Sequence, residues 1–134
     1  MKRFKSDDGV QQEPTKTELA VLQVLWKLGP STVRTVHDTL NDGKEAVQYT
    51  STLKLMQVMA EKGMLRRDES SMRHVYSAAM EEGGVKNQLL GRFLDTMYNG
   101  SVSNMMVALL GNEKTSGDDL EKLKDLLKEM EKKK

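Results

Sequence analysis

Residues 48–67 read QYTSTLKLMQVMAEKGMLRR, and this stretch decides the fold that we predict for the chain. Large and apolar residues recur in it at a spacing of three and four, which predicts a helix with one buried stripe. The stripe consists of Tyr49, Leu53, Met56 and Ala60, with Thr52 and Met59 beside it. Gly63 follows the last turn, where glycine readily adopts the left-handed conformation that ends helices. A strand that carries the basic pair Arg66-Arg67 would come next.

The opposite side of this predicted helix carries short polar side chains. Thr50, Ser51 and Lys54 project from it. Such side chains let a helix backbone approach a surface closely, and they can hydrogen-bond phosphates or base edges. A DNA-recognition helix followed by a basic wing would have this pattern. An ordinary amphipathic helix whose polar side faces water fits the pattern equally well.

Length and composition bound the class of protein. With 134 residues the chain suits one domain, or a small domain with a helical appendage. Hydrophobic residues make up 37% and charged residues 31%, and no apolar run approaches the length that spans a bilayer. The chain has no cysteine, which excludes disulfides and thiolate metal sites, and it shows no secretory signal pattern. We expect a cytoplasmic protein that does not insert into membranes.

The charge and the reactive residues narrow the function. The formal net charge of +1 is too small to identify a nucleic-acid partner, so the local arrangement of charge matters more. Four basic residues would cluster if the wing folds beside the helix: Lys54, Arg66, Arg67 and Arg73. Two isolated histidines, no phosphate-binding glycine loop and no acid pair leave no catalytic group to assign. We expect no enzymatic activity, no cofactor and no metal.

A first helix is predicted upstream. Thr15 and Glu18 have the spacing of a capping box, in which each side chain satisfies a backbone donor at the helix start. The helix would end near Leu28, because Gly29-Pro30 follows. Its apolar side would comprise Leu19, Leu22, Leu25 and Trp26, widened by Val21, Val24 and Leu28.

A shorter second helix should follow. Ser31 is the expected N-cap, and the helix would reach about Leu40 before a turn at Asn41-Asp42-Gly43. Val33 and Val36 would face inward. We place His37 at the surface or at the boundary of the core and assign it no chemistry.

Two short strands after the third helix predict a hairpin. Residues 64–68 and 73–78 flank a polar turn, and the second run has the valine and tyrosine content of a strand. Three helices and a hairpin, in this order, indicate a winged helix-turn-helix domain, placed at residues 14–80. The lead-in at residues 1–13 should be flexible, and its basic residues Lys2, Arg3 and Lys5 would serve either as a DNA-contacting arm or as a solvated tail. The predicted fold class is mainly α with a small β-hairpin.

The remaining residues, 81–134, are predicted to form a helical dimerisation domain. Glu82-Gly83-Gly84 would separate it from the hairpin, and helices would follow at 85–98, at 101–110 and from about Gly117 onward. These helices carry more apolar surface than they can hide among themselves, and burying each large side chain is worth about 1.5 to 3 kcal/mol. We therefore expect a second copy of the chain to cover this apolar surface. The alternative is that the helices fold back over the chain's own first domain, but the glycine pair disfavours such rigid docking.

The residues expected at the dimer contact all lie on the apolar stripes of these helices. They are Leu89, Leu90, Phe93, Leu94, Met97, Met105, Met106, Leu109, Leu123 and Leu127.

Three runs of the sequence carry a family resemblance. PTKTELAVLQVLWKLGPSTVRTVHDTL at 14–40, QYTSTLKLMQVMAEKGMLRR at 48–67 and RHVYSA at 73–78 resemble the BlaI/MecI/CopY family of bacterial repressors, the penicillinase repressors. The resemblance covers about residues 14–112, with a family-like helix after it. It implies a winged-helix domain that binds palindromic operator DNA, a helical dimerisation domain, and a partner that relieves repression: a membrane-bound sensor with a zinc-protease domain.

Carried over by position, the resemblance implies eight DNA-contacting residues. They are Gln48, Tyr49, Thr50, Ser51 and Lys54 on the third helix, and Arg66, Arg67 and Arg73 for the wing and the phosphates.

The chain departs from the family pattern at two places. Val58 stands where family members commonly have an arginine, which removes an expected DNA contact. Ala108-Leu109 stands at the position of the Asn-Phe bond that is cut in the penicillinase repressors, so induction by proteolysis lacks its usual bond. The copper-responsive branch is excluded on chemistry, because its cysteine motif is absent.

Two functions remain open at this point. The first is a homodimeric repressor that binds a palindromic operator through the third helix and the wing. The second is a winged-helix protein-interaction module without specific DNA binding, whose third helix docks on a partner.

Overall fold

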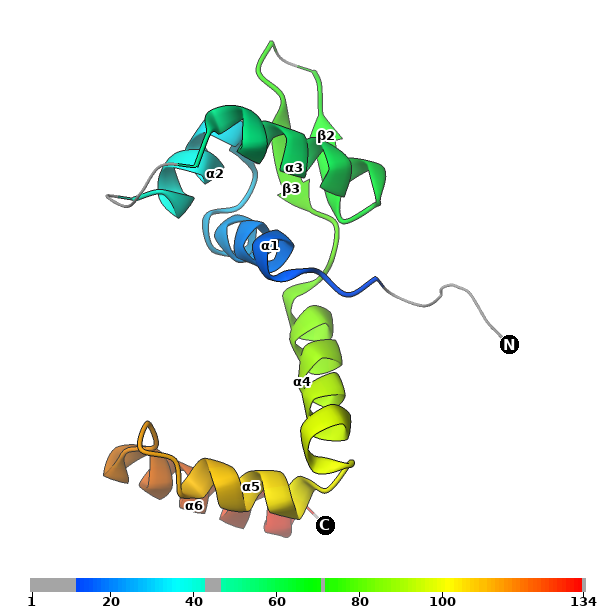
Figure 1. Ribbon diagram of the computed structural model, residues 1–134. Coiled ribbons are helices and arrows are strands. Elements are labelled where there is room, and N and C mark those ends of the chain that lie inside the picture. The colour runs from blue at the N-terminus through cyan, green and yellow to red at the C-terminus, as the bar shows by residue number, and fades with distance from the viewer. Residues whose placement is uncertain (1–11, 43–46, 71, 134) are drawn as a thin grey trace. The chain divides into compact units, whose positions relative to one another are not determined.

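The computed structural model describes residues 12–42, 47–70 and 72–133 of the chain (Figure 1). Within these ranges the chain forms six helices and three short strands. It divides into two compact units, 1–89 and 90–134. The predicted basic arm at Lys2, Arg3 and Lys5 and the turn glycine Gly43 lie outside the described residues.

Three helices build most of the first unit, as predicted. They are α1 at Lys16–Leu28, α2 at Val33–Leu40 and α3 at Tyr49–Glu61. The expected capping box begins α1: the Thr15 hydroxyl accepts a hydrogen bond from the Glu18 amide at 3.2 Å, and the Glu18 carboxylate accepts one from the Thr15 amide at 2.9 Å. Both backbone donors are thereby satisfied at the helix start.

The start of α2 differs from the prediction. Thr32, not Ser31, is the N-cap, and its hydroxyl accepts a hydrogen bond from the Thr35 amide at 3.2 Å. Ser31 is buried and donates to the Gly29 carbonyl at 2.9 Å. The prediction of Ser31 was wrong because residues Ser31–Thr32 form a short strand, β1, whose pairing keeps the backbone extended one residue longer.

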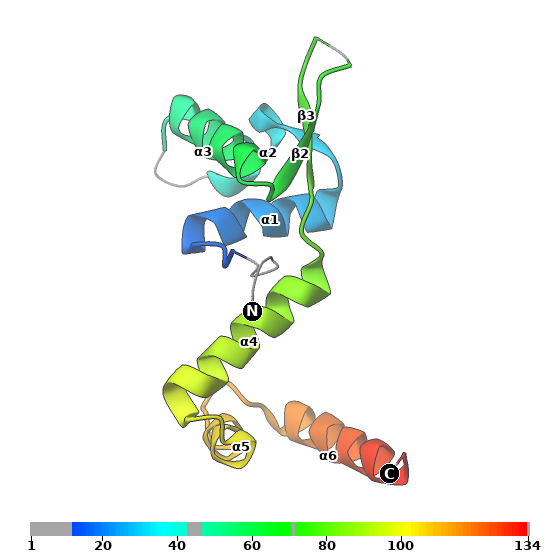
Figure 2. The ribbon, with the colours of Figure 1, turned by 90° about the vertical axis from the view of Figure 1, so that its right-hand side faces the viewer.

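The predicted hairpin is present, and it belongs to a three-stranded antiparallel sheet. Strands β2 at Leu65–Asp68 and β3 at Val75–Ala78 form the hairpin, and β1 pairs with the other edge of β3. The sequence pattern did not predict β1, because a strand of two residues leaves no alternation to detect. Figures 1 and 2 show the hairpin beside α3, with the end at which β2 leads into β3 projecting beyond the helices.

One core lies between the three helices and the sheet. Its fully buried side chains are Tyr76, Leu22, Met56, Met59, Met64, Val21 and Val36. On α3 the buried stripe centres on Thr52, Met56 and Met59, while the predicted stripe residues Tyr49, Leu53 and Ala60 are half-buried and pack at its edge. Leu28 was expected in the core but is 50% exposed, because it occupies the last turn of α1.

The chain enters α4 directly after the sheet. This helix spans Glu82–Tyr98, so Gly83 and Gly84 lie in its first turn and do not separate the two parts of the chain as predicted. An ion pair of 2.6 Å between Glu82 and Lys86, one turn apart, supports this early start. Val85 is buried.

The second unit contains the rest of α4 and two further helices, as predicted. They are α5 at Val102–Leu110 and α6 at Gly117–Lys132. The turn after α4 uses two residues with positive φ, Asn99 at 50° and Gly100 at 80°. Ser101 caps α5, and Ser116 begins α6 with a second capping box.

A charged pair joins α1 to the end of α3. The Lys62 ammonium group lies 2.8 Å from the Glu18 carboxylate, whose side chain is only 5% exposed. Burial opposes ionisation of Glu18, but hydrogen bonds from Lys62 and from the Thr15 amide outweigh it and hold the pKa of Glu18 below its usual value of 4.5. The pair therefore stabilises the fold when Glu18 is ionised.

We predict that Glu18→Gln lowers the free energy of unfolding by about 1 to 2 kcal/mol at neutral pH, since Lys62 remains 38% exposed and partly screened. The native pKa of Glu18 is lowered, so this stability difference should be complete above pH 4.5 and shrink as the pH falls through the native value. Urea unfolding as a function of pH measures it. Glu61→Gln, the same change at an exposed site, is the control and should cost less than about 0.5 kcal/mol. If the difference in the free energy of unfolding between the wild type and Glu18→Gln stayed constant well below pH 4.5, ionisation of Glu18 would not stabilise the fold.

Candidate nucleic-acid interface

The predicted polar side of α3 is exposed. Thr50, Ser51 and Lys54 face solvent, as does Gln48 just before the helix, while Tyr49 is half-buried. One turn beyond Lys54, the side chain of Val58 is half-buried. Because Thr52 faces the core, the residues around it are turned outward by the 100° step of the helix. The outward face of the first turns of α3 therefore carries the small hydroxyl side chains of Thr50 and Ser51 and one positive charge, that of Lys54.

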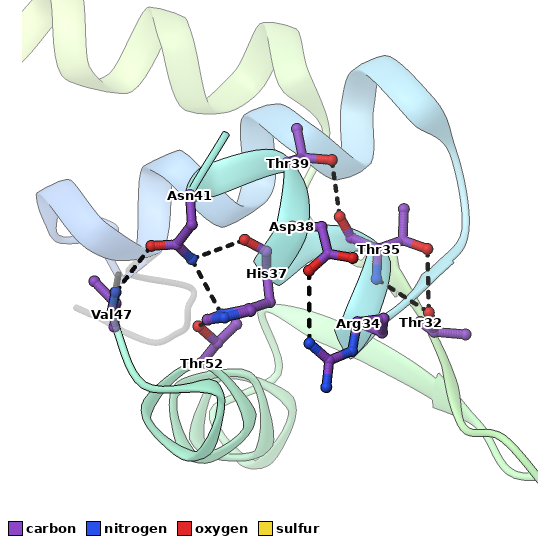
Figure 3. Close-up of polar contacts among 9 residues, drawn as sticks. All are labelled: Thr32, Arg34, Thr35, His37, Asp38, Thr39, Asn41, Val47 and Thr52. Carbon is purple, nitrogen blue, oxygen red and sulfur yellow. Dashed lines mark hydrogen bonds and ion pairs between the residues drawn. The ribbon is translucent and has the colours of Figure 1, made fainter. Parts of the chain in front are cut away.

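The connection between α2 and α3 is held by a small hydrogen-bond network (Figure 3). The Asn41 amide nitrogen donates to the His37 carbonyl at 2.8 Å, and the Asn41 amide oxygen accepts from the Val47 backbone at 3.0 Å. His37 Nδ1 lies 2.8 Å from the Thr52 hydroxyl. Asn41 thus fixes both ends of the connection, and His37 joins α2 to the buried side of α3.

His37 is a structural residue of this network. We expected it at the surface or at the boundary of the core; it is buried, with 8% of the residue exposed, because α3 packs against its side of α2. The Asn41 amide nitrogen also lies 3.1 Å from His37 Nδ1. The Thr52 hydroxyl and the Asn41 amide nitrogen are thus both within hydrogen-bonding distance of the same ring nitrogen.

Tyr49, the first residue of α3, is enclosed by α2. The guanidinium carbon of Arg34 lies 4.2 Å from the centroid of the Tyr49 ring, and the His37 ring meets it edge-on at 5.5 Å. Arg34 also pairs with Asp38 at 3.6 Å. Sequence reasoning missed Arg34, because its i,i+4 spacing to Asp38 suggests only a surface pair.

The hairpin separates two of the predicted contact residues. Arg66 and Arg67 are consecutive on β2, so their side chains leave opposite faces of the strand. Arg67 lies opposite Tyr76, and its guanidinium binds the Glu69 carboxylate through two contacts of 2.6 Å. Hydrogen bonds to Tyr76 and Glu69 raise the pKa of Arg67. Much of the positive charge of Arg67 is therefore satisfied within the wing.

The wing also carries acidic residues. Besides Glu69, Asp68 accepts a hydrogen bond from the Ser70 amide at 2.9 Å, and this bond lowers the pKa of Asp68. Both acids lie next to the arginines of β2 in the chain. The charge on the wing is consequently mixed, and the four basic residues do not form one uniform patch.

A hollow of about 370 Å³ lies between α2, the start of α3 and the beginning of β3. Arg34, Tyr49, Arg73 and His74 are among its lining residues. Arg73, which we assigned to the wing and the phosphates, therefore lies near the first turn of α3. His74 was not predicted, and no sequence pattern singles it out.

Two of the four basic residues predicted for the interface remain available for an anionic partner. Within residues 12–42, 47–70 and 72–133, the side chains of Lys54 and Arg66 make no hydrogen bond and no ion pair. The same described residues contain no group of three or more metal-ligating side chains. None of their helices is long and apolar enough to cross a membrane.

The predicted dimer-contact residues divide into two sets by exposure. The exposed ones are Leu90, Phe93, Met97, Leu109 and Leu127. The half-buried ones are Leu89, Leu94, Met105, Met106 and Leu123. Six further exposed apolar residues were not among the predicted contacts: Val102, Val107, Leu110, Leu120, Leu126 and Met130. No described side chain from residue 90 onward is buried.

The order of elements and the exposed third helix define a winged helix-turn-helix protein with a helical C-terminal part. The family described as Penicillinase repressor matches residues 14–129. The chain belongs to this family, whose members are transcriptional repressors.

Two curated relatives carry the same description. The Penicillinase repressor of Bacillus licheniformis is 26% identical over 113 residues, which cover 84% of this chain and 87% of the relative. The Penicillinase repressor of Staphylococcus aureus is 23% identical over 123 residues, which cover 92% and 97%. The alignments span both units of the chain, so the likeness extends beyond the DNA-binding fold.

We predict that Thr52→Val lowers the free energy of unfolding by about 1 to 2 kcal/mol, because it removes a buried hydrogen bond to His37 at nearly constant volume. Urea unfolding measures the change. Thr39→Val is the matched control, since the Thr39 hydroxyl bonds only within α2 and is exposed; it should change stability by less than about 0.5 kcal/mol. Equal effects of the two substitutions would show that the hydrogen bond between Thr52 and His37 does not stabilise the fold.

Proposed function

We propose that the protein is a homodimeric, sequence-specific DNA-binding repressor whose α3 enters the major groove of a palindromic operator. The observation that carries the proposal is the exposed face of α3, where two hydroxyls and one lysine without a partner among the described residues stand next to the hairpin. Membership in a family of repressors supports the same assignment. Hydroxyl and amide groups near the helix start, from Gln48 to Ser51, would read base edges.

The basic residues would have different tasks. Lys54 and Arg66 are free to meet phosphates, whereas Arg67 is braced by Glu69 and would present at most part of its charge. Arg73 would act near the start of α3, beside the hollow that it lines. Tyr49 would contribute chiefly by packing, because α2 holds its ring.

The exposed apolar surface of residues 90–134 supports homodimerisation. A helical unit of this size without a buried side chain among its described residues cannot be stable through its own core. Phe93 and Leu127, about half exposed, are typical of the side chains that a second copy would cover. A dimer would also bring two copies of α3 to half-sites about 34 to 36 Å apart along the duplex.

A membrane-bound sensor protease remains a proposed partner. The Ala108-Leu109 bond that aligns with the family's cleavage position lies inside α5, and both residues are exposed. A bond within a helix becomes accessible to a protease only when the helix opens locally. Cleavage there would therefore require α5 to unwind.

We predict that the protein shifts a duplex from the upstream region of its own gene, and that Lys54→Ala weakens this binding and reduces the slope of log K against log salt by about one unit. Gel shift or fluorescence anisotropy over a salt series measures both. Lys27→Ala, which removes one exposed charge from the end of α1, is the control and should leave the slope unchanged. If Lys54→Ala left the slope of log K against log salt unchanged, Lys54 would not contact a DNA phosphate. Absence of wild-type binding at low salt would refute the proposed function and favour a protein-interaction module.

We predict that Leu127→Glu raises the dissociation constant of the dimer by at least about 100-fold, because it places a charge at an apolar contact twice per dimer. Sedimentation velocity at micromolar concentration distinguishes monomer from dimer. The matched control is Lys128→Gln, which changes the net charge by the same amount one residue further along, on another face of α6. A wild-type monomer at this concentration would overturn the proposed assembly.

A further inference from the structure

We propose that Arg34 is a positioning residue for DNA recognition, which holds the first turn of α3 by stacking on Tyr49. The operator-binding part of this inference rests on the proposed function. The stacking itself is a property of the free protein and can be tested without DNA.

The first turn of α3 lacks the side-chain cap that begins four of the other helices. Thr15, Thr32, Ser101 and Ser116 each cap a helix with a side-chain hydrogen bond. Gln48 precedes α3 and makes no such bond. A helix start without a cap leaves backbone donors unsatisfied and frays more readily. Something other than a cap must therefore order the turn that carries the hydroxyls of Thr50 and Ser51.

Two residues of α2 supply this order by enclosing the Tyr49 ring. The Arg34 guanidinium lies over its face at 4.2 Å, well inside the range of about 6 Å for a cation–π contact. The His37 ring meets Tyr49 at 5.5 Å with an interplanar angle of 80°. His37 is itself fixed through Thr52 and Asn41, so the Tyr49 ring is held between the Arg34 guanidinium and the edge of the His37 ring.

Asp38 orients the Arg34 guanidinium. It lies one turn after Arg34 and pairs with it at 3.6 Å, yet both side chains are more than half exposed. An exposed pair of this kind adds little stability by itself. It does restrict the guanidinium to the side of α2 that faces Tyr49, so its contribution is to orientation.

Arg34 could instead meet a DNA phosphate directly, and the two roles predict different salt dependence. A phosphate contact contributes about 0.9 to the slope of log K against log salt, whereas a residue that acts through Tyr49 contributes nothing to it. The strength of binding would fall in both cases. The slope is therefore the measurement that separates positioning from contact.

The DNA-free experiment is a double-mutant cycle of Arg34→Ala and Tyr49→Leu, read by amide hydrogen exchange in residues 52–54 and by urea unfolding. Arg34→Ala should speed the exchange about two- to fivefold, the range expected of an exposed cation–π contact, and should have no further effect once Tyr49 is replaced. Arg34→Lys should restore part of the protection, and Asp38→Asn should have a smaller effect than Arg34→Ala. Unchanged exchange in Arg34→Ala, or fully additive effects in the cycle, would overturn the proposal.

The DNA experiment uses the duplex from the upstream region of the gene. Arg34→Ala should weaken binding about two- to fivefold with an unchanged salt slope, and Arg34→Lys should recover part of the loss. A slope lower by about one unit would overturn positioning in favour of a direct phosphate contact. If the wild-type protein bound no DNA, the proposed function would fail, and the exchange experiment would still decide whether Arg34 holds α3.

Discussion

The burial of one side of α3 is the constraint on which the rest of the structure depends. Met56 and Met59 are fully buried, and Thr52 continues their line toward the helix start. Once these three side chains face the core, the 3.6-residue period leaves Thr50 and Lys54 no direction but outward. The composition of the outward face is therefore a consequence of packing, and the core orients the surface that we propose for DNA.

The two ends of α3 are anchored by different interactions. At the C-terminal end, Lys62 reaches the buried Glu18 carboxylate, which also completes the capping box of α1. At the N-terminal end, α2 holds the helix through His37 and Arg34. Buried polar groups that are fully hydrogen-bonded rigidify the elements they join, whereas apolar contacts alone tolerate sliding. This arrangement fixes the position of α3 along its own axis, which a groove-binding helix requires.

Local patterns predicted most of the fold. The period of α3, the capping box at Thr15 and the turn at Asn99-Gly100 depend on residues close together in sequence, and all three are confirmed. The misses involve distant partners. Thr32 displaced Ser31 as N-cap because β1 pairs with β3, and His37 is buried because α3 packs on it. The separation of Arg66 from Arg67 followed from strand alternation and could have been predicted, but the bracing of Arg67 by Glu69 depends on the folded turn.

The charge distribution bears on why the proposed repressor would work in pairs. Net charge is only +1, the wing mixes acids with arginines, and Lys54 and Arg66 are the cations without partners in the described part of this surface. A single domain with so few phosphate contacts would bind DNA weakly at physiological salt. Joining two such domains makes the second contact intramolecular, and the effective concentration can then raise affinity by about 10² to 10⁴-fold. The apolar helices of residues 90–134 would thus supply through assembly the affinity that the sparse charge of each α3 and wing lacks.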